Sequence, residues 1–369
     1  DITINCSDYN DIACKKGEPP MSFNDMGELI ILACWGVYCQ DGQRVQYKVK
    51  DGKIKDRDIV SLGQKRVFDS ILSYINGNRL STSVTDVYFA GDNVYQYSIS
   101  DEEDKEYVDN DTKPPINKLG FRMDHQLEKF HECYDQIGQH VKRTFVGIGN
   151  HDIHTCDILN KQLNFDGWAN TGVYYSVRYE RSNDRNVTVI VIDTNMYEEN
   201  PLKCDKTPYT EKEKNDQREY VKQMCEIARN DWIIIIGHIP PYANGHKAKH
   251  KLIVNQGLRE LLREARPHLY VCGDEHNQQF IHDIETDQFI AVVGSGGTDL
   301  DPIYKENEDT YVAKDTYYAD KVFGFLSLRF EENLVVTFNQ CNSDATLVIK
   351  CQVQIQPDRK LSDRLFICK

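Results

Sequence analysis

Hydrophobic residues along this chain form short continuous runs, and between several of these runs they recur at helical spacing. Continuous apolar runs are typical of strands buried on both faces of a sheet. Strand-like segments of this kind lie at 29–33, 84–90, 143–148, 187–192, 232–236 and 268–272. Helices are expected at 67–75, 121–137 and 211–230. Strands that alternate with helices predict an α/β fold with mostly parallel strands.

Beyond Gln278 the pattern changes to short alternating strands. These are expected at 289–293, 323–330 and 334–338, with a hairpin turn at 331–333 between the last two. A β-rich ending of this kind predicts a second sheet packed against the first.

The change in pattern also suggests how the chain is organised. We expect residues 1–28 to form an N-terminal extension that Cys6 and Cys14 pin through disulfide bonding. Residues 29–340 would form the main domain, and 341–369 a strand-rich tail packed on it.

The composition limits the class of protein. The chain has 369 residues, 40% of them hydrophobic and 28% charged, which is enough apolar material for one large domain or two small ones. No run approaches the roughly 20 apolar residues that span a bilayer, so we expect no transmembrane segment. The formal net charge of −14 disfavours nucleic acid and anionic membrane surfaces as partners.

Twelve cysteines are a high count for a chain of this size, and they predict disulfides formed in an oxidising compartment. Three glycosylation sequons, at Asn5, Asn110 and Asn186, agree with export. The sequence begins at Asp1 with no signal-like stretch, which is typical of a mature chain after signal removal. We therefore expect a secreted, lumenal or cell-surface glycoprotein.

Polar residues directly follow five of the predicted buried strands. The five turns read Cys34-Trp35-Gly36, Gly91-Asp92-Asn93-Val94-Tyr95, Gly149-Asn150-His151-Asp152, Gly237-His238-Ile239-Pro240 and Gly273-Asp274-Glu275-His276-Asn277. Each turn alone is ordinary, but the carboxyl ends of parallel strands line one crevice, so we expect all five to converge. Carboxylate, phenol, amide and imidazole donors together suit iron, manganese or zinc.

The order GDN-x-Y, GNHD, GH-x-P and G-x-x-HN resembles the signature of purple acid phosphatases, which belong to the calcineurin-like metallophosphoesterase superfamily. The resemblance covers about residues 29–339, and it includes Ile192-Asp193-Thr194, Gly294-Ser295-Gly296-Gly297 and Gly324-Phe325. It implies an α/β fold in the form of a four-layer α/β/β/α sandwich, with two mixed sheets flanked by helices.

The resemblance also implies a dinuclear metal centre, with iron paired with iron, zinc or manganese, or a single ion where a half-site has lost its affinity. Asp92 would bridge the two ions. Tyr95 and His276 would bind the first ion, and Asn150 and His238 the second.

The catalytic residues implied by the resemblance are two histidines. His151 would contact the substrate phosphate and protonate the leaving oxygen, and His246 would be a second phosphate contact. Two adjacent cations neutralise phosphoryl oxygens and convert a bound water to hydroxide, the nucleophile, while an imidazole supplies general-acid assistance.

Two positions depart from the family pattern. Cys34 stands where the family has an aspartate ligand of the first metal, and Asp274 stands where it has a histidine ligand of the second. Asp274 could still coordinate as a carboxylate. Cys34 has three readings: a thiolate ligand, a disulfide with Cys39, or a buried inert thiol. If Cys34 and Cys272 are both thiols, ten cysteines remain for up to five disulfides.

The sequence therefore predicts a phosphomonoester hydrolase with an altered dinuclear centre, acting on a phosphorylated small molecule or protein. The alternative is a pseudophosphatase that serves as a secreted or surface structural protein with its own partner. A third reading has the two replacements adapting the site to a phosphodiester or nucleotide. Substrate choice would depend on the loops at 100–119 and 299–318, the first of them acidic and proline-containing.

Overall fold

The computed structural model describes residues 20–24, 26–35, 41–50, 53–77, 84–95, 137–169, 172–182, 184–198, 201–245, 256–303, 314–362 and 367–368. Several predictions lie outside these residues, namely the extension with Cys6 and Cys14, most of the helix at 121–137, the loop at 100–119, the sequons at Asn5 and Asn110, and His246. Among the described residues, none of the helices has the length and apolar character that crossing a bilayer would require.

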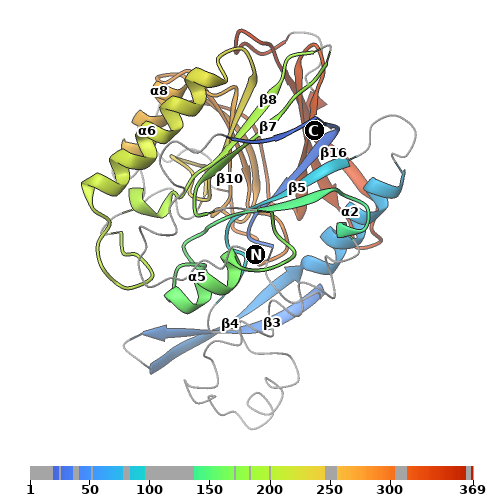
Figure 1. Ribbon diagram of the computed structural model, residues 1–369. Helices are drawn as coiled ribbons and strands as arrows, with labels where there is room; N and C mark the ends of the chain where they lie inside the picture. Colours follow the sequence, from blue (N-terminus) through green and yellow to red (C-terminus); the bar gives the residue numbers. More distant parts are fainter. Residues whose placement is uncertain are drawn as a thin grey trace.

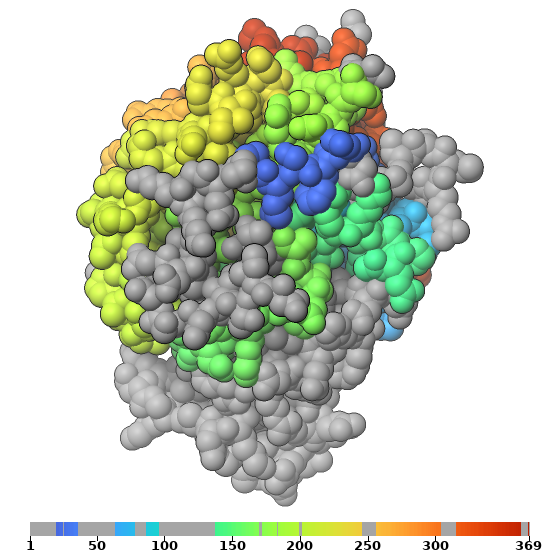
Figure 2. All heavy atoms as spheres, in the orientation of Figure 1, coloured from blue at the N-terminus to red at the C-terminus, as the bar shows by residue number. Residues whose placement is uncertain are grey.

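The first sheet has eight strands in the order β1-β7-β8-β9-β10-β12-β11-β13. Strands β8, β9, β10 and β12 run parallel, whereas β11 is antiparallel to both of its neighbours. The strands are β1 (Met21–Phe23), β7 (Tyr175–Tyr179), β8 (Val187–Val191), β9 (Trp232–Ile236), β10 (Leu269–Cys272), β11 (Gln278–Asp283), β12 (Gln288–Val293) and β13 (Lys314–Asp320). Figure 2 shows β1 on the surface of the molecule, beside the segment that contains β7 and β8.

The second sheet has seven strands in the order β17-β16-β15-β14-β2-β5-β6, with β2, β5 and β6 parallel. They are β2 (Glu28–Leu32), β5 (Val84–Ala90), β6 (Arg143–Gly147), β14 (Gly324–Phe330), β15 (Leu334–Cys341), β16 (Leu347–Ile355) and β17 (Ile367–Cys368). A separate hairpin of β3 (Asp41–Lys50) and β4 (Lys53–Gly63) extends from the body of the molecule (Figure 1).

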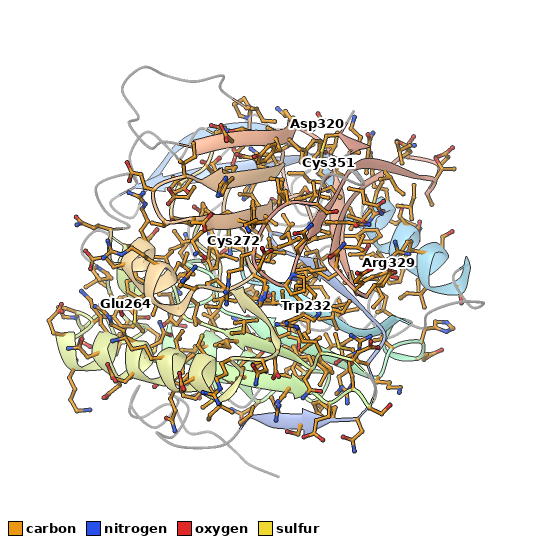
Figure 3. All side chains as sticks on the ribbon, turned by 90° about the horizontal axis from the view of Figure 1, so that it is seen from above. Trp232, Glu264, Cys272, Asp320, Arg329 and Cys351 are labelled. Atoms are coloured by element: carbon orange, nitrogen blue, oxygen red, sulfur yellow. A yellow bond between two sulfur atoms is a disulfide. The ribbon has the colours of Figure 1, made fainter. Side chains whose placement is uncertain are left out.

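The two sheets pack face to face, and each is covered by helices on its outer side. Helices α6 (Glu211–Ile227) and α8 (Gln256–Ala265) lie over the eight-stranded sheet, and α2 (Gln64–Gly77) lies over the other (Figures 1 and 3). The short helices α5 (Cys156–Leu163) and η2 (Asn195–Tyr197) complete the described elements. This arrangement confirms the predicted four-layer sandwich.

Residues 29–32 of strand β2 are all apolar because the strand is buried on both faces. Leu29 and Ile31 belong to the core between the sheets, whereas Ile30 and Leu32 belong to the core beneath α2. Burial on both faces favours apolar side chains at successive positions, and this produces the continuous run seen in the sequence. The same alternation places Ile234 of β9 between the sheets and its neighbours beneath α6 and α8.

The predicted helix at 211–230 is confirmed as α6, and its start has a clear local cause. Thr210 and Glu213 form a capping box: the Glu213 backbone N–H donates to Thr210 Oγ1 at 3.2 Å, and the Thr210 backbone N–H donates to Glu213 Oε2 at 2.7 Å. Two backbone donors at the helix start are thereby satisfied.

The predicted second sheet is present, but the C-terminal strands are divided between the two sheets instead of forming one of them. Strands β11, β12 and β13 extend the sheet of β8–β10, while β14, β15 and β16 lie beside β2. The sequence pattern predicted strands correctly but carried no information on which sheet each would join.

The predicted number of disulfides also needs correction. Cys34, Cys225, Cys272 and Cys341 are all thiols, which leaves eight cysteines for at most four disulfides. Those described are Cys156–Cys204 and Cys351–Cys368.

Candidate metal centre

The two sheets meet at the carboxyl ends of β2, β5, β6, β9 and β10. The Ala33 N–H donates to Val293 O at 3.2 Å, which joins the end of β2 to the other sheet. On the opposite side, His238 Nδ1 lies 2.9 Å from Ala90 O, which joins the loop after β9 to the end of β5. The five predicted turns therefore converge at one junction between the sheets.

Glycines allow the loops to approach this closely. A Cβ atom at Gly149 would lie 2.3 Å from the backbone nitrogen of Asp92, and one at Gly273 would lie 2.5 Å from the Cβ of Ala33. Any larger residue at either position would push two of the loops apart. The glycine that begins these turns is thus required by packing as well as by turn geometry.

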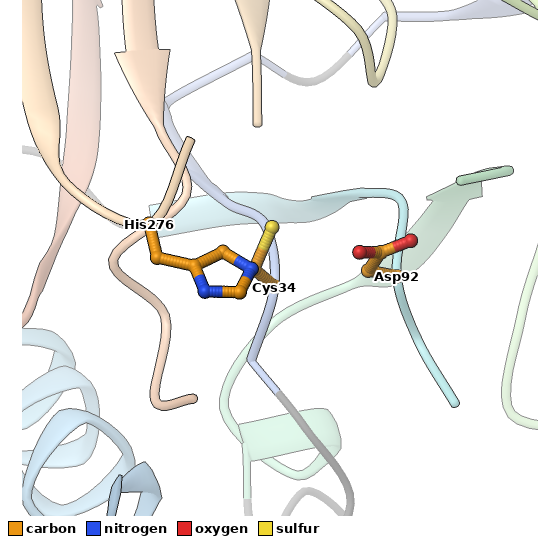
Figure 4. Close-up of side chains that lie close together, drawn as sticks. All are labelled: Cys34, Asp92 and His276. Atoms are coloured by element: carbon orange, nitrogen blue, oxygen red, sulfur yellow. The ribbon is translucent and has the colours of Figure 1, made fainter. Parts of the chain in front are cut away.

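One group of donors consists of Cys34, Asp92 and His276, whose ligand atoms all lie within 4.8 Å of one another (Figure 4). All three side chains are buried. Tyr95 borders this group, with its ring 6.4 Å from that of His276. Burial, and then the negative charges of Asp92 and Cys34, hold the pKa of Tyr95 well above its ordinary value.

A second group surrounds His238. Its Nε2 atom lies 3.2 Å from Asp92 Oδ1 and 4.0 Å from Asp274 Oδ1. Burial alone would lower the pKa of His238, but the carboxylates of Asp92 and Asp274 and the carbonyl of Ala90 together outweigh it and raise the pKa to about 9. Two carboxylates facing one imidazole therefore favour positive charge at this point.

Several donor atoms here make no hydrogen bond within the protein, and this is the observation that tests whether a metal fits. Among the described residues, buried atoms without a hydrogen-bond partner include Asn150 Oδ1, His238 Nε2 and both ring nitrogens of His276. A buried polar atom left unsatisfied typically costs about 1–3 kcal/mol. Four such atoms beside two carboxylates and a thiol form a donor set that suits a cation, so the residues present fit the predicted centre.

The backbone is strained at three of these positions. Cys34, Asp92 and Asp274 all have positive φ, of 52°, 55° and 64° respectively. Non-glycine residues adopt this left-handed region at a cost, which Asp tolerates better than most residues because its side chain can hydrogen-bond locally. The strain is held by neighbouring loops: the Cys34 N–H donates to Gly91 O at 3.1 Å.

Asp152 ties the β5 and β6 loops together. Its carboxylate accepts from the backbone N–H groups of Asn93 at 2.9 Å, Val94 at 3.0 Å and Gly149 at 2.7 Å, and from Asn93 Nδ2 at 3.1 Å. Burial and the nearby Asp92 raise the pKa of Asp152 to about 7. The motif containing Asp152 was recognised in the sequence, but no role was assigned to this residue.

Sequence reasoning also missed three further supporting residues. Thr194 Oγ1 accepts from the backbone N–H groups of His238 at 3.1 Å and Ile239 at 2.9 Å, which fixes the loop after β9. Asp299 Oδ1 and Asp301 Oδ2 lie 3.4 and 3.8 Å from His276 Nδ1. The Ile192-Asp193-Thr194 motif points to Thr194 in the sequence. The two aspartates lie in the loop at 299–318, which was predicted only to contact substrate.

The remaining predicted residues lie as follows. The His151 backbone N–H donates to Asp92 Oδ1 at 3.2 Å, and its ring lies 4.7 Å from that of Tyr95, so it borders the same junction. Cys34 is a thiol, which excludes the disulfide with Cys39. Asn186 lies far from these loops, in the β7–β8 turn, where its Oδ1 accepts from the Arg181 N–H at 2.8 Å.

Comparisons with known proteins agree with this geometry. The profile of the calcineurin-like phosphoesterase family matches residues 58–278. Tartrate-resistant acid phosphatase type 5 of Mus musculus is 24% identical over 227 residues, which cover 58% of this chain and 60% of that protein. The chain thus aligns with less than two thirds of this relative's length.

Two solved structures share the fold. Purple acid phosphatase PPD1 from yellow lupin (Lupinus luteus) is 14% identical with a TM-score of 0.56, over 90% of this chain and 54% of that one. The Plasmodium protein GAP50, described as the anchor in the inner membrane complex, is 17% identical with a TM-score of 0.53, over 86% of this chain and 85% of that one. Both structures show the same fold, and the family profile, the acid phosphatase relative and the lupin structure confirm the resemblance to purple acid phosphatases predicted from the strand-end motifs.

Proposed function

Because the chain belongs to the calcineurin-like phosphoesterase family, we propose that it hydrolyses phosphomonoesters at a dinuclear metal centre bridged by Asp92. The observation that carries this proposal is the convergence of buried donor atoms from both sheets, several of which have no hydrogen-bond partner among the described residues. The substrate would be a phosphorylated small molecule or protein.

The donors divide into two half-sites. Cys34, Tyr95 and His276 would hold the first ion, and Asn150, His238 and Asp274 the second, with Asp92 shared between them. Iron, zinc and manganese are the candidate metals, from the oxygen, nitrogen and sulfur donors present. When bound, the ions supply Lewis-acid neutralisation of the phosphoryl oxygens and activation of water.

The chain's own residues supply orientation and proton transfer. His151 stands at the rim, with its backbone held by Asp92, and would protonate the leaving oxygen of the substrate. Asp152 and Thr194 hold the backbones of the ligand loops, so the donors keep their positions when substrate enters. His246 is proposed as a second contact to the phosphate.

The test is turnover of p-nitrophenyl phosphate by the purified chain, with the metal content measured on the same sample. We expect His151→Ala to lower kcat by about a hundredfold to ten-thousandfold, the usual contribution of a general acid, with the metal content unchanged. His154→Ala is the matched control, because His154 is also half-buried and lies three residues further along the chain. This variant should keep wild-type turnover. Equal activity in both variants would contradict the assignment of His151.

A second candidate is a structural or interaction protein that has lost catalysis. It is favoured by the two replaced ligands, Cys34 and Asp274, one in each half-site, and GAP50 shows that an anchor protein can share this fold. Less than one metal per chain together with no turnover on phosphomonoesters, phosphodiesters or nucleotides would favour this candidate over the hydrolase.

We also propose that the chain is a glycoprotein in an oxidising compartment, secreted, lumenal or at the cell surface. The two described disulfides support this proposal. The sequon residue Thr188 is buried, and its hydroxyl donates to Asp231 Oδ2 at 2.8 Å, so a glycan at Asn186 must be attached before the chain folds. Enzymatic deglycosylation should lower the mass of the native protein. In the Asn186→Gln variant, this loss of mass should be smaller by one glycan.

A further inference from the structure

The first half-site differs chemically from the second. Cys34 contributes a sulfur, whereas Asn150, His238 and Asp274 contribute only oxygen and nitrogen. Figure 4 shows the Cys34 sulfur beside the imidazole of His276, with the Asp92 carboxylate opposite them. These three side chains come from the ends of β2, β10 and β5 and are 0%, 7% and 0% exposed, so they form a built interior site.

The sulfur has a defined position. A Cβ atom at Gly273 would lie 3.3 Å from Cys34 Sγ, and one at Gly294 would lie 3.4 Å from it. Two glycines therefore leave the space that the sulfur occupies. The backbone N–H of Thr298 donates to Cys34 O at 3.1 Å, which adds to the Gly91 contact in fixing the residue.

His276 is oriented toward the same point. The carboxylates of Asp299 and Asp301 lie on the Nδ1 side of its ring, at 3.4 and 3.8 Å, and Asp301 also accepts from the His276 backbone N–H at 3.0 Å. Carboxylates on the Nδ1 side leave Nε2 as the candidate metal ligand, which is the usual arrangement of a metal-binding histidine. The two carboxylates approach Nδ1 without the geometry of a hydrogen bond, and Nε2 has no hydrogen-bond partner among the described residues.

The size of the group suits a small tetrahedral ion. Zinc binds sulfur at about 2.3 Å and nitrogen or oxygen at about 2.0–2.2 Å, so its ligand atoms lie roughly 3.3–3.8 Å apart. The Cys34, Asp92 and His276 donors lie within 4.8 Å of one another, which exceeds that spacing by at most about 1.5 Å.

From these observations we propose that the first half-site is a thiolate zinc site, with Cys34, Asp92 and His276 as protein ligands and one position open. Tyr95, assigned to this ion in the proposed function, would then border the zinc instead of binding it. A thiolate favours zinc over hard cations such as manganese, and three protein ligands with an open position are typical of catalytic rather than structural zinc. The second half-site, with only oxygen and nitrogen donors, suits a harder divalent ion. The proposal rests on the proposed function only in requiring that a metal binds.

Cobalt(II) titration of the metal-free full chain tests this, because cobalt occupies zinc sites and a thiolate ligand gives a charge-transfer band in the near ultraviolet. We expect the band to saturate at one equivalent and to disappear when zinc is added. Cys34→Ser should abolish it and weaken zinc binding at least tenfold. Cys272→Ser is the matched control: this buried thiol lies at the end of β10, but it packs on the outer face of the sheet and donates to Ala291 O, so the band should persist.

X-ray absorption at the zinc edge of the wild-type protein keeps the test independent of variant folding, and we expect one sulfur at about 2.3 Å. Zinc surrounded only by nitrogen and oxygen, or a cobalt band that survives in Cys34→Ser, would overturn the proposal. Turnover of p-nitrophenyl phosphate on the same samples separates the two hypotheses. A sulfur ligand without turnover refutes the proposed function alone, and turnover without a sulfur ligand refutes the thiolate site alone.

Discussion

Acid should destabilise the fold through His268, a residue outside the metal centre. This histidine precedes β10 and is buried, and its ring packs edge-on against Trp232 with the centroids 4.8 Å apart. The Ile233 N–H donates to its Nδ1 at 3.0 Å, and its Nε2 donates to Pro357 O at 3.2 Å. The bond from Ile233 requires the neutral ring, because protonation of Nδ1 would remove its acceptor, whereas the bond to Pro357 would persist.

The magnitude follows from the pKa. Burial, and then the positive charge of Arg359, lowers the pKa of His268 from 6.5 to about 3. The pKa of His268 is lower in the folded chain than in the unfolded chain. Its contribution to stability is therefore complete above pH 6.5 and is lost progressively as the pH falls from 6.5 toward 3. In this range the unfolded chain binds a proton that the folded chain does not. Each pH unit well below 6.5 costs about 1.4 kcal/mol, which gives a loss of about 2 kcal/mol at pH 5.

The assay is urea unfolding followed by tryptophan fluorescence between pH 7.5 and 5, on wild type and His268→Gln at identical metal concentrations. Glutamine can accept from Ile233 and donate to Pro357, yet it does not titrate. The variant should therefore lose about 2 kcal/mol less than wild type by pH 5. The control is His282→Gln. His282 lies on β11 and pairs with Asp287, and this variant should follow wild type. Parallel curves for wild type and His268→Gln would refute the reasoning.

Three further predictions concern the metal centre and the loops that hold it. Cys34→Asp combined with Asp274→His should raise the iron or manganese content measured by elemental analysis, because a carboxylate replaces a thiolate that favours zinc over harder cations, and an imidazole replaces a shorter carboxylate; no gain would mean that the two motifs are misaligned with the family. Asp152→Ala should lower the free energy of unfolding by about 3 kcal/mol, because it leaves several buried N–H groups unsatisfied, and a change below 1 kcal/mol in chemical denaturation would contradict that role. Replacing Cys156 and Cys204 by serine should cost about 4 kcal/mol in the same assay, since the disulfide closes a loop of 48 residues; an unchanged urea midpoint would show that the loop stays ordered without it.

The elements predicted correctly from sequence are those buried on both faces or with a strong amphipathic stripe. Strand β9, with its run of isoleucines, and helix α6, with its capping box, carry their signals locally. The hairpin of β3 and β4 was missed, because charged and polar residues occupy most of its positions and leave no apolar run. Strand β7, rich in tyrosine with a single valine, was missed for a similar reason.

The site was predictable as far as its motifs extend along the chain. The turns containing Asp92, His238 and His276 could be found because each follows a strand whose apolar run is visible. The state of Cys34 could not be found, because it depends on which groups surround the sulfur after folding. Thr194 supports His238 from 44 residues away, and no local spacing records such a contact.

The position of the donors at the junction of the two sheets has a mechanical consequence. A cation held by Asp92 from one sheet and His276 from the other would cross-link the two halves of the sandwich. By mass action, the folded state would then become more stable as the metal concentration rises above the dissociation constant of the metal from the folded protein. Metal supply and folding would then be coupled for the whole molecule. A descendant of this chain without any turnover would still gain rigidity from keeping these ligands.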